Sequence, residues 1–155
     1  MPKAVIETQV RAVFPTSGGC AIFLGNDDKT FVIYVDQSVG AAITMAMRST
    51  PKERPQTHDL INDIFTAIGA EVLRVVINDF KDGVYFARLI FHMENEVQER
   101  KIVELDARPS DSIAIAVAAG ASIFVAEHVW ADADDMSDVL RKMEDSGFEI
   151  GENED

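Results

Sequence analysis

Cysteine is almost absent from this sequence of 155 residues, which contains only Cys20. A single cysteine excludes an intrachain disulfide and any metal site built from several thiolates of one chain. Such cysteine usage is typical of proteins that fold in a reducing cytosol. We therefore predict a cytoplasmic protein whose stability depends on its apolar core.

Long hydrophobic runs are also missing. No stretch without a charged residue is longer than 15 residues, and the one from Ser112 to Ala126 is interrupted by Gly120. A transmembrane helix needs about 20 predominantly apolar residues, and the N-terminal segment lacks the apolar centre of a signal peptide. We expect no membrane partner.

Positive charge is scarce as well, because 14 Lys and Arg residues stand against 27 Asp and Glu residues. The net charge is −13, of which residues 132–155 contribute −8 with ten acidic and two basic residues. Residues 1–131 contain the other 17 acidic and 12 basic residues and carry −5. Proteins that bind nucleic acid usually present a basic surface to the phosphates, so the composition argues against that function class.

The residues that are present predict one globular domain, with 47% apolar and 26% charged residues. Apolar and β-branched patterns predict strands at 3–14, 20–24, 30–35, 71–78, 84–93, 100–105 and 122–125. Helical periodicity predicts helices at 37–49, 57–68 and 109–119, and a last amphipathic helix around 136–143. We predict an α+β fold with a mixed, mostly antiparallel sheet, in which residues 1–131 form the domain and 132–155 add a helix and an acidic, loose tail.

Three finer expectations concern which faces are buried. Along the first strand, one face should consist of apolar side chains: Ile6, Val10, Ala12 and Phe14. The helix at 37–49 should bury Ile43, Ala46 and Met47. The helix at 57–68 should be capped by Thr57 and should bury a row of apolar residues: Leu60, Ile61, Ile64, Phe65 and Ile68.

An internal repeat is visible in this order of elements. Three strands, an aspartate and a helix occur twice, and the intervals Asp36–Ile43 and Asp106–Ile113 have the same length. We infer a duplicated β3–α unit, with the helix at 57–68 inserted between the copies. The second junction differs by an added Arg108, Pro109 and Asp111, which makes it the candidate site, although a firmer helix cap would explain the same residues.

The junction from Leu105 to Gly120 reads LDARPSDSIAIAVAAG. Proline fits the first helical position, and the start of a helix attracts anions. Polar groups gather there: Asp106, Arg108, Ser110 and Asp111. The structural alternative is that Ser110 and Asp111 cap the helix while Arg108 pairs with Asp106.

Phosphodiester hydrolysis would require groups that bind the phosphate and activate water. Mg²⁺ or Mn²⁺ held by carboxylates can do both, and the candidate metal ligands are Asp106 and Asp111, followed by Asp79 and Asp82 in a tight turn before a glycine. Arg108 could stabilise charge on the phosphate. A turn rich in aspartate is, however, usually only a turn.

A second group of candidates precedes and begins the helix at 57–68. His58 could serve as a general base or, when protonated, bind a phosphate oxygen. Arg48, Arg54 and Thr57 could bind substrate. The alternative is that Thr57 and Asp59 cap the helix and His58 is a surface residue of its first turn.

Three segments resemble motifs of the bifunctional nuclease family: ARPSDSIAIA (Ala107–Ala116), RPQTHDL (Arg54–Leu60) and NDFKDGVYFARL (Asn78–Leu89). They occur in the family's order. The resemblance implies an α+β nuclease that cleaves RNA and DNA with little sequence preference. One departure is that the first junction has Val39 and Ala41 where members of the family often carry Glu and Gln.

Several residues stand at matching positions of these motifs: Arg54, Thr57, His58, Asp59, Asp79, Asp82, Gly83, Tyr85, Asp106, Arg108, Pro109, Ser110 and Asp111. The competing hypothesis is a non-enzymatic regulatory or ligand-binding module, which the acidic composition favours. For either function we predict a homo-oligomer, because apolar content is high for one small domain and closed dimers are the commonest assemblies.

Overall fold

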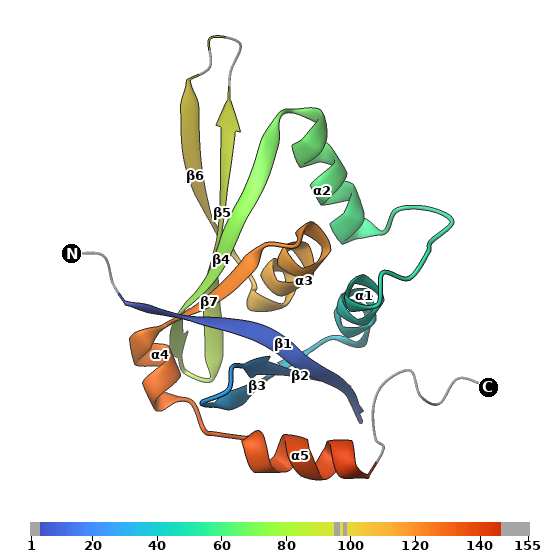
Figure 1. Cartoon of the computed structure of the whole chain (residues 1–155), viewed down its shortest axis with the longest axis vertical. Coiled ribbons are helices and arrows are strands. Elements are labelled where there is room, and N and C mark those ends of the chain that lie inside the picture. Colours follow the sequence, from blue (N-terminus) through green and yellow to red (C-terminus); the bar gives the residue numbers. More distant parts are fainter. Residues whose placement is uncertain (1–3, 95–96, 98, 147–155) are drawn as a thin grey trace.

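The computed structural model describes residues 4–94, 97 and 99–146, within which seven strands form one mixed sheet accompanied by five helices (Figure 1). The strands are β1 (Val5–Thr16), β2 (Gly19–Gly25), β3 (Thr30–Val35), β4 (Ala70–Lys81), β5 (Val84–Glu94), β6 (Arg100–Ala107) and β7 (Ser122–Ala126). The helices are α1 (Gln37–Met47), α2 (Thr57–Ala67), α3 (Pro109–Ala119), α4 (Glu127–Asp132) and α5 (Ser137–Asp145). The predicted α+β class is confirmed.

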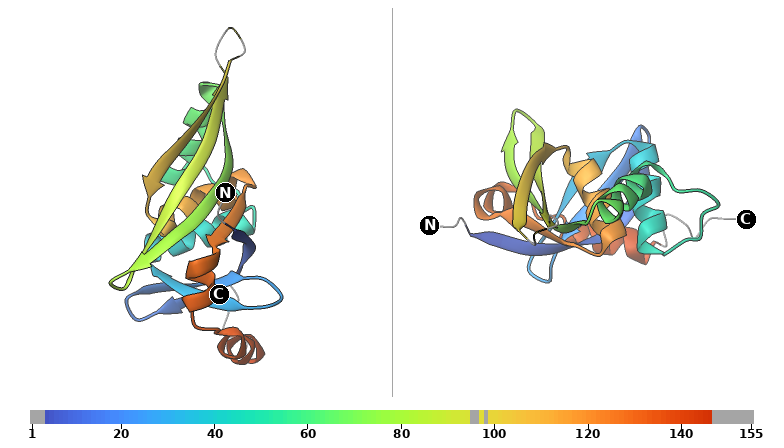
Figure 2. Two further views of the ribbon diagram at one scale, coloured as in Figure 1. Left: turned by 90° about the vertical axis from the view of Figure 1, so that its left-hand side faces the viewer. Right: turned by 90° about the horizontal axis from the view of Figure 1, so that it is seen from above.

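The strand order is β3-β2-β1-β7-β4-β5-β6. Only β4 and β7 run parallel in the described sheet, and its other neighbouring strands run antiparallel. β7 therefore joins two antiparallel three-stranded parts that are distant in sequence. Figures 1 and 2 show that these parts are turned strongly against each other, as the twist of a large sheet requires.

The main core lies between the sheet and the helices α1 and α3. A second, smaller cluster lies on the other face, where Leu140 of α5 packs against Phe14 and Phe23. A register shift between Val10 and Ala12 changes the face of the sheet to which the even-numbered side chains of β1 point. Val10 packs on the main core whereas Ala12 belongs to the second cluster, so the predicted common face of β1 is wrong, because a bulge interrupts the alternation.

The predicted buried face of α2 is wrong for three of its five residues. Ile61 and Phe65 pack on the core, and the Phe65 ring stacks on Phe91 with centroids 4.8 Å apart. The side chains of Leu60, Ile64 and Ile68 are about half exposed. Figure 1 shows α2 at the periphery of the helical layer, and its contacts with the core come from Ile61 and Phe65.

Two helix details also differ from expectation. The N-cap of α2 is Gln56, so Thr57 is the first helical residue and not its cap. The backbone N–H of Gln56 is bound by the Asp59 carboxylate at 2.9 Å. Met47 at the end of α1 is exposed, whereas Val39 and Ile43 supply the buried side of that helix.

The C-terminal part contains a short helix, α4, that the sequence patterns did not predict. It places Trp130 edge-on to Phe31, with ring centroids 6.1 Å apart. The predicted loose tail after residue 146 lies outside the described residues. None of the helices in the described part of the chain is both long and apolar enough to cross a bilayer.

The element order strand, strand, strand, helix occurs in both β1–α1 and β4–α3, and α2 lies between the two units. The two helix starts nevertheless differ. Asp36 is the N-cap of α1, but Asp106 lies two residues before Arg108, the N-cap of α3. Superposition of residues 5–47 on 72–117 stays a prediction of the proposed duplication.

Candidate functional site

The site begins where two strands pass into two helices. β3 leads into α1 through Asp36, and β6 leads into α3 through Arg108 and Pro109. α1 and α3 pack against each other, although their starts are more than 70 residues apart in the sequence. The two N-termini therefore direct their free backbone N–H groups and the positive ends of their dipoles toward neighbouring regions of space.

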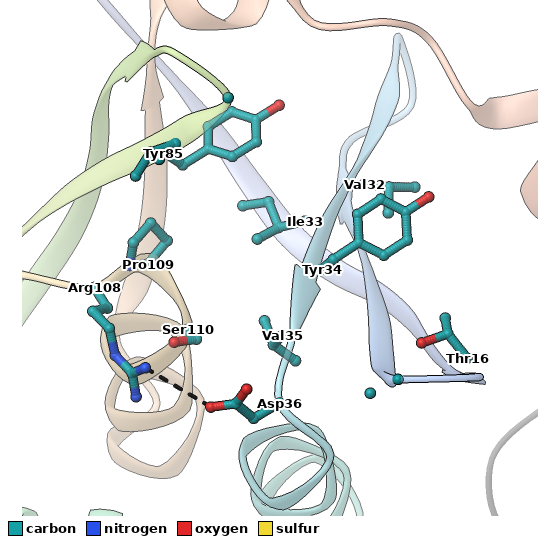
Figure 3. Close-up of a pocket in the computed structure, with 14 residues that line it drawn as sticks. Thr16, Val32, Ile33, Tyr34, Val35, Asp36, Tyr85, Arg108, Pro109 and Ser110 are labelled. Atoms are coloured by element: carbon teal, nitrogen blue, oxygen red, sulfur yellow. Dashed lines mark ion pairs between the residues drawn. The ribbon is translucent and has the colours of Figure 1, made fainter.

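A pocket of about 620 Å³ lies beside these two junctions. Its walls come from the edge strand β3, the β1–β2 turn, the β4–β5 turn and the start of α3 (Figure 3). The described lining residues are Thr16, Gly18, Gly19, Val32, Ile33, Tyr34, Val35, Asp36, Gly83, Val84, Tyr85, Arg108, Pro109 and Ser110. The charged groups in this lining are one guanidinium and one carboxylate.

The β4–β5 turn, which forms one wall of the pocket, is a tight hairpin turn. Asp82 and Gly83 both have positive φ, at 52° and 78°, which is the requirement of a two-residue type I′ turn. After the turn, the ring of Tyr85 packs at a tilt against the rings of Phe80 and Phe31, with centroids 4.3 and 5.8 Å away. The predicted positive φ at Gly83 is confirmed.

Arg108, Asp111 and His58 form one network at the start of α3. Arg108 Nε donates to Asp111 Oδ2 at 2.9 Å, and His58 Nε2 lies 3.1 Å from Asp111 Oδ1. A second guanidinium nitrogen of Arg108 lies 3.8 Å from Asp36 Oδ2, across the pocket floor (Figure 3). The expected pairing of Arg108 with Asp106 is therefore replaced by pairing with Asp111 and Asp36.

The network holds Asp111 in its ionised form. Burial works to raise the pKa of Asp111, but the hydrogen bonds from Arg108 and His58 and their charges outweigh it and lower the pKa below its usual value. The same contact raises the pKa of Arg108 above its usual range. An ionised carboxylate only accepts hydrogen bonds, so Nε2 of His58 carries the proton toward Asp111, and in neutral imidazole Nδ1 is then the nitrogen that can accept one.

His58 is not the surface residue of the structural alternative, since its side chain is only 13% exposed. Asp111 is not merely a cap of α3, because its two carboxylate oxygens contact the side chains of Arg108 and His58. Asp59 does bind the N-terminus of α2, and it also accepts from Lys52 Nζ at 2.7 Å. That hydrogen bond, followed by the one from the backbone of Gln56, lowers the pKa of Asp59.

Other predicted site residues are not gathered around the pocket. Asp106 lies exposed on β6 opposite Arg88, Arg48 forms the C-cap of α1, and Arg54 is exposed in the segment before α2. Neither these residues nor Thr57 line the pocket as the structure describes it. Of the four residues predicted at the second junction, Arg108 and Ser110 line the pocket and Asp111 contacts Arg108.

The predicted metal ligands do not come together at one place, because each contacts different neighbours. Asp79 lies 3.2 Å from Lys81 Nζ and 3.6 Å from His128 Nε2, and the Lys81 contact is the main reason that its pKa is lowered. Asp82 sits at the exposed hairpin tip. In the described part of the chain, no three His, Cys, Asp or Glu side chains lie close enough to hold a metal ion together.

Three charged or aromatic residues of the pocket were not among the predicted site residues. Asp36 was used only as the repeated aspartate before a helix, and Tyr34 only as part of a predicted strand. Tyr85 stands within a family motif but carried no assigned role. The comparison of the two junctions named Asp36 but selected only the second junction as the site, and nothing local indicates that Tyr34 is 72% exposed.

The fold and the pocket define an α+β protein with a candidate anion site at paired helix N-termini. The chain belongs to the bifunctional nuclease domain family, whose model matches residues 22–137. That range contains all three motif segments and most of the pocket. Membership places the chain in a nuclease-like class.

Two relatives from Mycobacterium tuberculosis are similar to this chain. The uncharacterized proteins MT1877 (strain CDC 1551 / Oshkosh) and Rv1829 (strain ATCC 25618 / H37Rv) are each 39% identical to it over 108 residues. The match covers 70% of this chain and 61% of each relative, so the chain spans less than two thirds of their length.

Proposed function

We propose that this protein is a nuclease that hydrolyses phosphodiester bonds in RNA and DNA with little sequence preference. The observation that carries the proposal is the Arg108–Asp111–His58 network beside the pocket at the N-termini of α1 and α3. It combines a cation for a phosphate, a histidine for proton transfer and a carboxylate that orients the histidine. Membership in a nuclease domain family supports the same class of reaction.

The proposed roles follow from the contacts. Arg108 is 63% exposed, so its guanidinium can bind a phosphate oxygen while its Nε remains on Asp111. Asp111 is a positioning residue that fixes the tautomer of His58. His58 accepts a proton from the attacking water as oxygen bonds to phosphorus, and the departing oxygen of the broken P–O bond takes a proton from solvent.

Assistance by Mg²⁺ or Mn²⁺ remains part of the proposal. The described carboxylates do not form a ready ligand set of three. Mg²⁺ is, however, often held by one or two carboxylates together with waters and substrate phosphate oxygens. Asp111 at the start of α3 and the exposed Asp106 at the end of β6 are the residues that would take this part; Asp79 lies on β4 beside the hairpin turn, and Asp82 lies in that turn.

The test is a cleavage assay on purified protein with RNA and DNA, each single- and double-stranded, in Mg²⁺, Mn²⁺ or EDTA. Wild type should cleave, and His58→Ala should reduce turnover by about 100-fold or more, the scale of general base catalysis. Loss of activity in EDTA and in Asp106→Asn supports the metal proposal, whereas full activity in both contradicts it. Absence of cleavage under every condition contradicts the nuclease function.

The second candidate is a non-enzymatic ligand-binding or regulatory module. The balanced charges of the pocket, with Arg108 facing Asp36, favour it, because a nucleic-acid channel is usually more basic. Binding of substrates without any cleavage in the same assay would support this candidate. We propose a cytoplasmic homo-oligomer for both functions, and the exposed apolar stripe of Leu60, Ile64 and Ile68 on α2 is consistent with association.

A further inference from the structure

Tyr34 is the most exposed large apolar side chain on the pocket wall. Its residue is 72% exposed, although it lies in the middle of β3 between the buried Ile33 and the half-buried Val35. β3 is paired with β2 through Tyr34 and Ala21, so the backbone that carries the ring is held by the sheet. The ring adds little to the core and leaves its aromatic faces open to a ligand.

Tyr34 and Arg108 both line the pocket at the edge strand β3. Figure 3 shows the Tyr34 ring on one side of β3 and Arg108 on the other, with Ile33 and Val35 on the side of Arg108, so a ligand that contacts both groups passes over the edge of the sheet. Tyr85, on the β4–β5 hairpin, completes the wall above Arg108 (Figure 3). An exposed ring and an exposed guanidinium that share one pocket match the two parts of a nucleotide, its base and its phosphate.

We propose that the pocket takes single-stranded nucleic acid, with one unpaired base stacked on Tyr34 while a neighbouring phosphate binds Arg108. The inference deepens the proposed function and rests on it. Stacking on an aromatic side chain requires a free π-face, which bases in a duplex have already used on each other. Because every base has such a face, the same contact accounts for RNA and DNA substrates without sequence preference.

The test measures binding by fluorescence anisotropy at low salt with three labelled oligonucleotides. These are a ten-residue oligothymidylate, an abasic ten-mer with the same phosphates, and a duplex of equal length. Gel analysis after each titration shows whether the probe is intact. The proteins are wild type, Tyr34→Ser, Tyr34→Phe and Ile102→Ser, the last removing an exposed apolar side chain from the opposite edge strand, β6.

Wild type should bind oligothymidylate more tightly than the abasic strand or the duplex. Tyr34→Ser should weaken oligothymidylate binding on the order of tenfold, which corresponds to one stacked base, and leave abasic binding unchanged. Tyr34→Phe and Ile102→Ser should both bind like wild type. Melting temperatures confirm that each variant is folded.

Two results would overturn the inference: equal binding of the abasic and thymidine strands by wild type, or an equal loss for both strands in Tyr34→Ser. Tighter binding of the duplex would overturn it as well. These failures differ from failure of the proposed function, which is the absence of cleavage in the nuclease assay whatever the binding of the three probes.

Discussion

Asp111→Asn is the substitution that best separates catalysis from stability in this protein. Asparagine keeps the shape of the side chain, and its Oδ1 can still accept from His58 Nε2. Its Nδ2 would instead face Arg108 Nε, which is also a donor, so the 2.9 Å contact is lost together with the negative charge.

The stability cost follows from the exposure of the partners. A hydrogen bond between charged groups is worth about 1.5–3 kcal/mol when buried, but exposed ion pairs contribute roughly 0.2–1 kcal/mol. Asp111 is 34% exposed and Arg108 63% exposed, so we expect a loss near the upper end of the second range, about 1 kcal/mol. For a domain of this size that lowers Tm by about 2–4 °C.

The pH dependence gives an independent check. The folded-state pKa of Asp111 is lowered, so its stabilising contribution is present above the unfolded pKa of about 3.9 and is lost as the pH falls through the folded value. The Tm difference between wild type and Asp111→Asn should therefore be constant near neutral pH and should shrink below about pH 4.

The assay measures Tm and turnover on the same samples. Turnover should fall by about 100-fold or more because His58 loses its charged orienting partner. Asp138→Asn is the matched control, because Asp138 also lies in a first helical turn and pairs with an arginine three residues later, Arg141, away from the pocket. Full turnover in folded Asp111→Asn would refute the proposed role, as would a loss of stability with intact activity per folded molecule.

Three further predictions concern stability and assembly. Gly40→Ala should lower Tm by several degrees, because the added Cβ would overlap the buried Cys20 side chain. The control is Gly18→Ala, whose Cβ meets no atom within 4 Å and which should leave Tm almost unchanged. An unaltered Tm in Gly40→Ala would contradict this packing. Asp59→Ala should lower the free energy of unfolding by about 1 kcal/mol, the scale of a lost helix cap. The substitution removes the hydrogen bonds that Asp59 accepts from Lys52 and from the backbone of Gln56. Thermal or urea unfolding measures the change, and a clearly smaller loss would contradict these contacts. Light scattering at micromolar concentration should return the mass of a dimer or larger assembly, and a monomer mass would contradict the predicted homo-oligomer.

Much of the fold could be predicted from local patterns. Alternating and β-branched segments identified the strands, and the DG pair before Val84 identified the hairpin turn because positive φ is a local requirement. Pro109 marked the start of α3 for the same kind of reason, since its φ already suits the first helical position. These features depend on neighbouring residues, which the sequence displays directly.

Burial was predicted less well where it depends on which other element packs against a helix or strand. The apolar stripe of α2 looks continuous in sequence, but α2 lies at the periphery, so Ile61 and Phe65 are covered while Leu60 and Ile64 are not. Tyr34 resembles its buried neighbours in composition, but its side chain alternates with those of Phe31 and Ile33, which face the main core, so it points away from that core and is exposed.

The sequence by itself determined which residues begin α3 and which family the chain resembles. Only the tertiary structure decided that Asp111 meets His58, 53 positions away, and that Arg108 faces Asp36 and not Asp106. The physical reason is that helix and strand periodicities are local, whereas these partners meet because β7 joins the two three-stranded parts and α1 and α3 pack side by side. Side chains near the start of one helix can then reach charges on elements that no local pattern connects to it.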